Sequence, residues 1–241
     1  MRLTSRDIGA YIYCPTLYFK GRQDKIDSPL NIFERSIRDT FIDAEENVLL
    51  KDSIITVKKL MRSWDNIWWP LTMEYKLDVK KAEKKTLKAT EKFIDYCNYE
   101  ISDYLWPTVG VDVESQVYIK NNLLIVHADL IKVDLKSNKK NTVLINFTNR
   151  RLSIRDAAFN NEIKTIAYGF YSGGGETITH INININELIN KVEMNISTFQ
   201  PEDMVEIEKM LYHISSGIQN RVQYMNPHAC ERCNVCKEFK S

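Results

Sequence analysis

The 241-residue sequence has neither a long apolar run nor an excess of charge of one sign. No stretch approaches the roughly 20 consecutive apolar residues of a membrane-spanning helix, so no membrane partner is expected. The 33 basic and 32 acidic residues leave a net charge of +1. This excludes a global basic field, and a nucleic-acid surface would have to be local. The first seven residues lack the apolar core of a secretory signal, which predicts a cytoplasmic protein.

Cysteine is scarce, and its placement is uneven. The five cysteines are an odd number, and reducing compartments disfavour disulfides, so a metal or cluster explains them better. Cys14 lies near the N-terminus, whereas Cys230, Cys233 and Cys236 follow one another at two-residue gaps near the C-terminus. Such gaps let successive thiolates turn toward one centre, and four thiolates suit either an iron–sulfur cluster or tetrahedral zinc. The sequence therefore predicts a metal clasp that joins the two ends of the chain.

The hydrophobic patterning changes once along the chain. The 44% of apolar residues suffices for the core of one large domain. Before about residue 105 the apolar positions recur at helical spacing, and beyond it they begin to alternate at a period of two. We therefore expect a single domain over 1–241, with a helical lobe over about 25–105 and a core of strands and helices over about 106–200.

The expected elements make a mixed sheet flanked by helices, an α/β arrangement. Helices are expected at Leu3–Tyr13, Asn31–Leu50, Ser153–Tyr171 and from Pro201 to about Arg221. Strands are expected at Val111–Ile119, Leu123–Leu135, Thr142–Thr148, Thr177–Asn186 and Lys191–Ile196.

Two motifs, together with the order of elements, carry a resemblance to a known family. One is Cys14 with Tyr18 four residues later, and the other is the helix from Pro201 followed by the lead-in to Cys230. They resemble the RecB/AddB-like branch of the PD-(D/E)XK nucleases that holds a four-cysteine iron–sulfur cluster, as in the iron–sulfur CRISPR adaptation nucleases. The resemblance implies a restriction-endonuclease-like fold and a 4Fe–4S cluster on the four clasp cysteines. The short gap before Cys236 departs from the family pattern and leaves zinc as the alternative.

The resemblance also implies where an active site should lie. Such nucleases hold divalent metal between carboxylates, beside a lysine that assists the attacking water. The first carboxylate follows a small residue on the second strand, a position that Asp129 takes here. The next strand should carry Asp/Glu-x-Lys, but Asn146 and Thr148 stand at the acid and lysine positions. A single remaining carboxylate makes a poor Mg²⁺ site.

Neighbouring residues offer partial replacements. The family's upstream helix usually supplies a metal-binding histidine, but Asn31–Leu50 contains none. His127 is expected to face the same side of its strand as Asp129, whereas Asp134, in an Asp-Leu-Lys sequence, lies an odd five residues away and should face the other side. Glu114, on the first strand, is either an acidic neighbour of the site or a solvent-facing strand residue.

Basic and aromatic residues beyond the third strand are candidates for nucleic-acid contacts. The resemblance places Lys164 and Tyr168 where the family has the Gln-x-x-x-Tyr that contacts DNA. Arg150 and Arg151 follow the third strand and could bind phosphate, or could form a solvated approach to the next helix.

The resulting hypothesis is a nuclease-fold metal-cluster protein that does not cut. It would bind single-stranded or branched DNA, or act as a structural subunit among other proteins in a DNA-processing, phage or mobile-element complex. One alternative is an active exonuclease or endonuclease, dependent on Mg²⁺ or Mn²⁺, with a migrated site built from Asp129, Asn146, Glu114 and Lys164 or Lys132. The other alternative is a zinc-stabilised protein–protein interaction module.

Overall fold

The computed structural model describes part of the chain: residues 1–19, 32–49, 108–134, 141–148, 157–173, 175–185 and 193–223, with single positions between 62 and 87. Most of the expected helical lobe lies outside these ranges, so the lobe stays a prediction. The same holds for five predicted site residues: Cys230, Cys233, Cys236, Arg150 and Arg151. None of the helices within these ranges is both long and apolar enough to cross a bilayer.

Six strands of the described ranges form one mixed sheet. They are β1 (Arg2–Thr4), β2 (Thr108–Ile119), β3 (Asn122–Val133), β4 (Asn141–Thr148), β5 (Thr177–Asn184) and β6 (Glu193–Phe199). The order is β1-β3-β4-β5-β6, with β2 on the other side of β3. The β1–β3 and β4–β5 pairs are parallel, and the other pairs are antiparallel. The expected mixed sheet is therefore confirmed.

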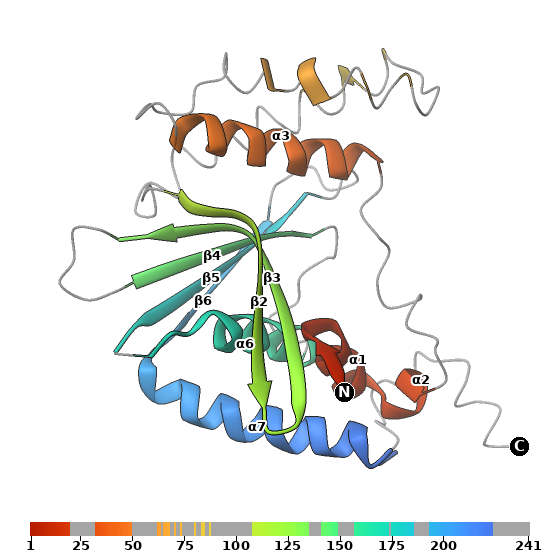
Figure 1. The fold of residues 1–241 in the computed structure, drawn as a ribbon. Coiled ribbons are helices and arrows are strands. Elements are labelled where there is room, and N and C mark those ends of the chain that lie inside the picture. Colours follow the sequence, from red (N-terminus) through yellow and green to blue (C-terminus); the bar gives the residue numbers. More distant parts are fainter. Residues whose placement is uncertain are drawn as a thin grey trace, which may run out of the picture.

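Helices cover both faces of this sheet, which gives three layers (Figure 1). The helix α3 (Ile32–Leu49) lies over one face. The other face carries α1 (Ser5–Tyr13), α6 (Ala157–Phe170) and α7 (Pro201–Gln219), and the short α2 (Pro15–Phe19) follows α1.

The start of the chain differs from the expectation. A helix was predicted from Leu3, but residues 2–4 form β1 and the helix begins at Ser5. The hydroxyl oxygen of Thr4 accepts a hydrogen bond from the Asp7 backbone N–H at 3.2 Å, and the Asp7 carboxylate accepts one from the Thr4 N–H at 2.8 Å. This capping box fixes the helix start. A three-residue strand is too short to show a hydrophobic period, and β1 forms because it pairs with residues 123–125 of β3.

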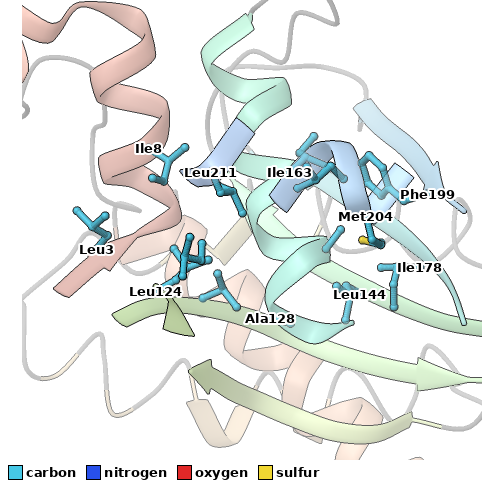
Figure 2. Packing of buried hydrophobic residues seen from close by; sticks show 14 of the residues in the cluster. Leu3, Ile8, Leu124, Ala128, Leu144, Ile163, Ile178, Phe199, Met204 and Leu211 are labelled. Atoms are coloured by element: carbon cyan, nitrogen blue, oxygen red, sulfur yellow. The ribbon is translucent and has the colours of Figure 1, made fainter. Parts of the chain in front are cut away.

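The core divides into two clusters, one on each face of the sheet. The cluster under α1, α6 and α7 is the larger and is shown in Figure 2; it includes Leu3, Ile8, Leu124, Ala128, Leu144, Ile163, Ile178, Phe199, Met204 and Leu211. The cluster under α3 comprises Ile37, Phe41, Leu130, Val143, Ile145, Phe147, Ile181, Ile183 and Ile185. The central strands β4 and β5 supply apolar residues to both clusters, as expected of strands buried on both faces.

Helix α6 approaches β3 closely at Gly169. A Cβ built on Gly169 would lie 2.2 Å from Cγ2 of Val126. We expect Gly169→Ala to lower the free energy of unfolding by about 1–2 kcal/mol, because overpacking outweighs the gain in helix propensity. Denaturant unfolding measures this change. The same substitution made in a Val126→Ala background should cost much less, and an equal cost in both backgrounds would contradict the close packing.

Candidate metal site

The candidate site lies where the sheet forks. β3 pairs with β1 only over residues 123–125 and with β4 only over 130–133, so the stretch between them has no strand partner on that edge among the described strands. Side chains make the missing hydrogen bonds. The Phe147 N–H of β4 donates to Oδ2 of Asp129 at 2.7 Å, and Nδ2 of Asn146 donates to the His127 carbonyl at 3.1 Å. The fork therefore holds the Asp129 carboxylate in one place.

A second carboxylate reaches the fork from β2. In the β2–β3 register Val111 faces Leu130 and Val113 faces Ala128, which sets Asp112 beside Asp129. Asp112 has a φ of +52°, a left-handed conformation that aspartate tolerates better than most residues. The pairing is also irregular near the start of β2, between residues 108 and 110. Irregular strand backbone re-aims side chains, and here it accompanies the contact of Asp112 with His127.

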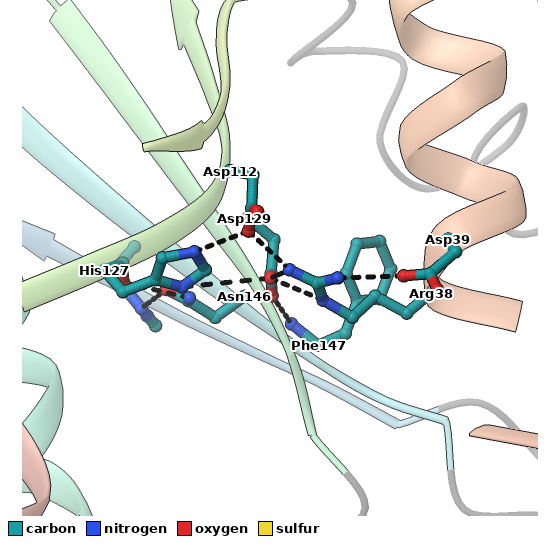
Figure 3. A network of polar contacts seen from close by, with 8 residues as sticks. Arg38, Asp39, Asp112, His127, Asp129, Asn146 and Phe147 are labelled. Atoms are coloured by element: carbon teal, nitrogen blue, oxygen red, sulfur yellow. Dashed lines mark hydrogen bonds and ion pairs between the residues drawn. The ribbon is translucent and has the colours of Figure 1, made fainter. Parts of the chain in front are cut away.

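Asp112, His127 and Asp129 form one cluster, drawn in Figure 3. Their candidate ligand atoms all lie within 4.8 Å of one another. Nε2 of His127 lies 2.7 Å from Oδ1 of Asp112, and its Nδ1 lies 3.9 Å from Oδ1 of Asp129. Two carboxylates and an imidazole form a donor set that suits a divalent cation such as Mn²⁺. The expectation of a single remaining carboxylate is therefore wrong, because Asp112 is a second one.

Arg38 of α3 reaches into this cluster (Figure 3). Its Nε donates to Oδ1 of Asp129 at 2.7 Å, and its terminal Nη2 donates to Oδ1 of Asp112 at 2.7 Å. A third bond, from Nη1 to Asp39 at 2.9 Å, holds the guanidinium from its own helix. The resemblance placed a metal-binding histidine on this helix, but α3 supplies the positively charged guanidinium of Arg38 to the cluster.

The charges of the cluster support one another. Burial lowers the pKa of Arg38, but the charge of Asp129 and hydrogen bonds to three carboxylates outweigh it and raise that pKa above its usual value. The hydrogen bond from His127 holds the pKa of Asp112 below its usual value; burial raises that pKa, and the hydrogen bond and charge of Arg38 add to the lowering. Asp129 is buried, with 5% of its side chain exposed, whereas Asp112 and His127 are open to solvent at 62% and 44%. A ligand can therefore approach from the side of Asp112 and His127.

Asn146 lies at the fork, but its amide is already engaged. Besides its bond to the His127 carbonyl, its Oδ1 lies 2.9 Å from Nε2 of His180 on β5. His180 is fully buried. The Asn146 side chain therefore joins strands β3, β4 and β5 and does not add a ligand to the Asp–His–Asp group.

Burial of His180 gives stability a pH dependence. Burial lowers the pKa of His180 from its usual 6.5 to about 3. Below pH 6.5 the unfolded chain takes up a proton at this histidine and the folded chain does not, so stability falls as the pH drops toward 3. We expect a loss of about 2 kcal/mol between pH 6.5 and 4.5 from this residue. Denaturant midpoints at both pH values in wild type and His180→Leu measure it, and an unchanged pH slope in the variant would contradict it.

Other predicted residues near the fork take separate places. Glu114 is exposed, faces His127 across the strand pair and accepts a bond from Gln116 at 2.8 Å, so it is a solvent-facing strand residue beside the cluster. Lys132 is buried on β3, opposite Val143. Thr148 ends β4, where its carbonyl accepts the Ile185 N–H at 2.8 Å. Its side chain does not substitute for a lysine cation.

The remaining candidates lie away from the cluster. Lys164 and Tyr168 are on α6, which packs on the face opposite α3. Burial, together with the charge of Glu208 on α7, raises the pKa of Tyr168 to about 12. Cys14 is a fully buried thiol at the end of α1 and forms no disulfide within the described part of the chain. The structure therefore does not bring Lys164 and Tyr168 together with Asp129.

Sequence reasoning missed two residues of the site, Arg38 and Asp112. A signal existed for Asp112: counting back from the two-residue turn at Lys120 and Asn121 places it opposite Asp129. Arg38 is 91 residues from its partner, and nothing in the pattern of its helix sets it apart from Arg35.

Comparisons with known proteins support the fold. No family model matches the sequence, and no curated protein is detectably similar to it. A structure named "Putative exonuclease" from Eubacterium rectale matches over 98% of this chain and 87% of its own, with a TM-score of 0.50 and 9% identity. A structure named SSO0001 matches over 89% of this chain and 75% of its own, with a TM-score of 0.32 and 10% identity, which is too weak to support an inference. The first likeness shows that this chain shares the α/β fold of that structure.

Proposed function

We propose that this chain processes nucleic acid, and that it holds one divalent cation between Asp112, His127 and Asp129 and cleaves a phosphodiester there. The observation that carries the proposal is the cluster itself, in which three donor atoms converge at a solvent-accessible fork of the sheet. A likeness in fold to a structure named as an exonuclease agrees with it.

Each residue of the cluster has a distinct role in this proposal. Asp129 is the fixed ligand, since the Phe147 N–H holds one of its oxygens. Asp112 and His127 are the exposed ligands on the side from which a phosphate approaches. A divalent cation bound there would supply Lewis acidity and lower the pKa of a bound water. Arg38, released from the carboxylates when the cation binds, would contact the phosphate by its planar fork of donors. Arg38 would thereby take the role of the family's lysine, whose position is occupied by Thr148 in this chain.

A second reading has its own supporting observation. Arg38 contacts both Asp112 and Asp129, so its guanidinium occupies the same oxygens that a cation needs. In this interpretation the guanidinium replaces the cation permanently. The protein would then bind single-stranded or branched DNA without cutting it, or it would serve as a structural subunit. The absence of an acid at 146 and of a lysine at 148 also favours this reading.

The terminal clasp completes the proposal. Cys14 is the buried C-cap residue of α1, and a buried thiol at the end of this helix agrees with a role as a metal ligand. We propose that it joins Cys230, Cys233 and Cys236 around a 4Fe–4S cluster, with zinc as the alternative. Metal analysis of protein purified without oxygen separates the two: about four irons per chain and a brown colour indicate the cluster, and a single zinc rejects it.

A cleavage assay separates the two functional readings. Labelled single-stranded DNA, branched DNA and RNA are incubated with the full chain in Mn²⁺, in Mg²⁺ and in EDTA. The proposal predicts products that need the cation and that are lost in EDTA. Salt-dependent binding of the same substrates without any products would favour the reading in which Arg38 replaces the cation.

A further inference from the structure

We propose that His180 is a positioning residue for the candidate site: as its Nε2–H tautomer, it fixes the Asn146 amide, which in turn holds the backbone carbonyl of His127. The inference deepens the proposed function, because His127 is one of its three ligands. This bond ties β4 to β3 at a carbonyl in the stretch of β3 between its pairings with β1 and with β4.

The hydrogen bonds assign every proton in this chain of contacts. A backbone carbonyl only accepts, so the Asn146 group 3.1 Å from the His127 oxygen is the donating Nδ2. Oδ1 of Asn146 is then an acceptor, and the His180 Nε2 at 2.9 Å carries the hydrogen. Nδ1 of neutral His180 therefore carries no hydrogen.

The environment of His180 holds it in this role. Its backbone is paired with Leu144 of β4 on one side and with Ser197 of β6 on the other, so the ring is anchored in the middle of the sheet. The ring is fully buried, which keeps it neutral and so keeps one of its nitrogens free of a proton.

The same environment makes His180 an unfavourable choice for stability alone. Its Nδ1 is buried without a hydrogen-bond partner among the described residues. A buried polar atom left unpaired lowers stability, and an apolar side chain of similar volume would avoid that penalty. The one side-chain hydrogen bond given for His180 is that to Asn146. Its value therefore lies in the placement of Asn146 and His127.

The test compares two substitutions in the full chain without added Mn²⁺ or Mg²⁺. His180→Gln keeps a donor near the position of Nε2, whereas His180→Leu removes the donor and keeps the volume. We expect His180→Leu to unfold within a few degrees of wild type at pH 7, because it removes the unpaired Nδ1 but leaves Oδ1 of Asn146 without its donor. We also expect the Asn146 side-chain amide protons to exchange with solvent at least about ten times faster in it, because the amide oxygen loses the bond that anchors the group while the protons still donate to the His127 carbonyl. In NMR spectra the His127 ring signals should shift in His180→Leu and stay near wild type in His180→Gln.

Mn²⁺ binding adds a second readout. Loss of an outer partner of a ligand typically weakens metal binding by about 10- to 100-fold, so His180→Leu should bind Mn²⁺ more weakly by that factor and His180→Gln should not. Unchanged amide exchange and unchanged His127 signals in His180→Leu would overturn the inference, whatever the protein does with metal. If instead these signals respond as expected while wild type binds no Mn²⁺, the inference stands and the cation site of the proposed function fails.

Discussion

Replacing Arg38 by alanine is expected to lower the free energy of unfolding, measured without added Mn²⁺ or Mg²⁺, by about 2–4 kcal/mol, and Mn²⁺ is expected to restore most of that loss. Asp129 has only 5% of its side chain exposed, and Arg38 gives it its closest positive charge among the described residues. Without Arg38 the buried carboxylate loses its closest countercharge among the described residues, and breaking a pair in this way is costly. A divalent cation would supply that countercharge again. Denaturant unfolding with and without Mn²⁺ measures both effects.

Arg35 gives this prediction a matched control. It lies one turn earlier on α3 and is exposed. Arg35→Ala removes the same side chain from the same helix, so it should change stability by less than about 0.5 kcal/mol and leave the response to Mn²⁺ unchanged. If Arg38→Ala is as stable as Arg35→Ala, the ion pair at the fork does not hold the site together as the geometry implies.

Mn²⁺ binding and cleavage by Arg38→Ala distinguish the two proposed functions. If Arg38 only neutralises the carboxylates in the metal-free state and later contacts phosphate, Arg38→Ala should bind Mn²⁺ more tightly and cleave more slowly. If Arg38 permanently replaces a cation, the wild type binds no Mn²⁺ and Arg38→Ala acquires a site. Isothermal titration with Mn²⁺ separates these outcomes, because only the second begins from no binding.

The substitution Asp129→Asn is expected to reduce cation-dependent cleavage by at least about a hundredfold. The amide adds no negative charge and presents a donor or a weak acceptor where Arg38 and a cation both require a carboxylate oxygen. The change should also abolish measurable Mn²⁺ binding, so that the loss of rate appears as a loss of the cation site. Single-turnover cleavage and Mn²⁺ titration of the same preparation measure the two effects.

Asp134→Asn is the control for that substitution. It makes the same chemical change at the residue that follows the end of β3. There the Asp134 N–H donates to the Asn141 carbonyl at 3.0 Å. Asp134→Asn should therefore cleave and bind Mn²⁺ as wild type does. Equal activity of Asp129→Asn and wild type would place any catalytic centre elsewhere in the chain.

Much of the scaffold follows from the sequence because its elements have clear periods. The expected helix over 31–50 agrees with α3 to within one residue at each end, and the strands from β2 to β6 lie within about three residues of their expected bounds. Alternation along β3 also predicted that His127 and Asp129 share a side, and their side chains do meet. Periodicity succeeds here because burial on one face or on both imposes it.

The completed site could not be predicted in the same way. Asp112 joins it through a left-handed backbone conformation, and Arg38 joins it through the docking of a helix 91 residues away in sequence. Neither feature leaves a local pattern. The family resemblance directed attention to Asn146 and Thr148, where the expected acid and lysine are missing, whereas the second carboxylate comes from the neighbouring strand on the other side.

The most direct test of this account is a crystal structure of the chain grown with Mn²⁺, with the anomalous difference density calculated at the manganese edge. The account predicts one peak between Asp112, His127 and Asp129, with Arg38 turned away from both carboxylates. No peak at the fork, with Arg38 still bridging Asp112 and Asp129 at saturating Mn²⁺, would contradict it.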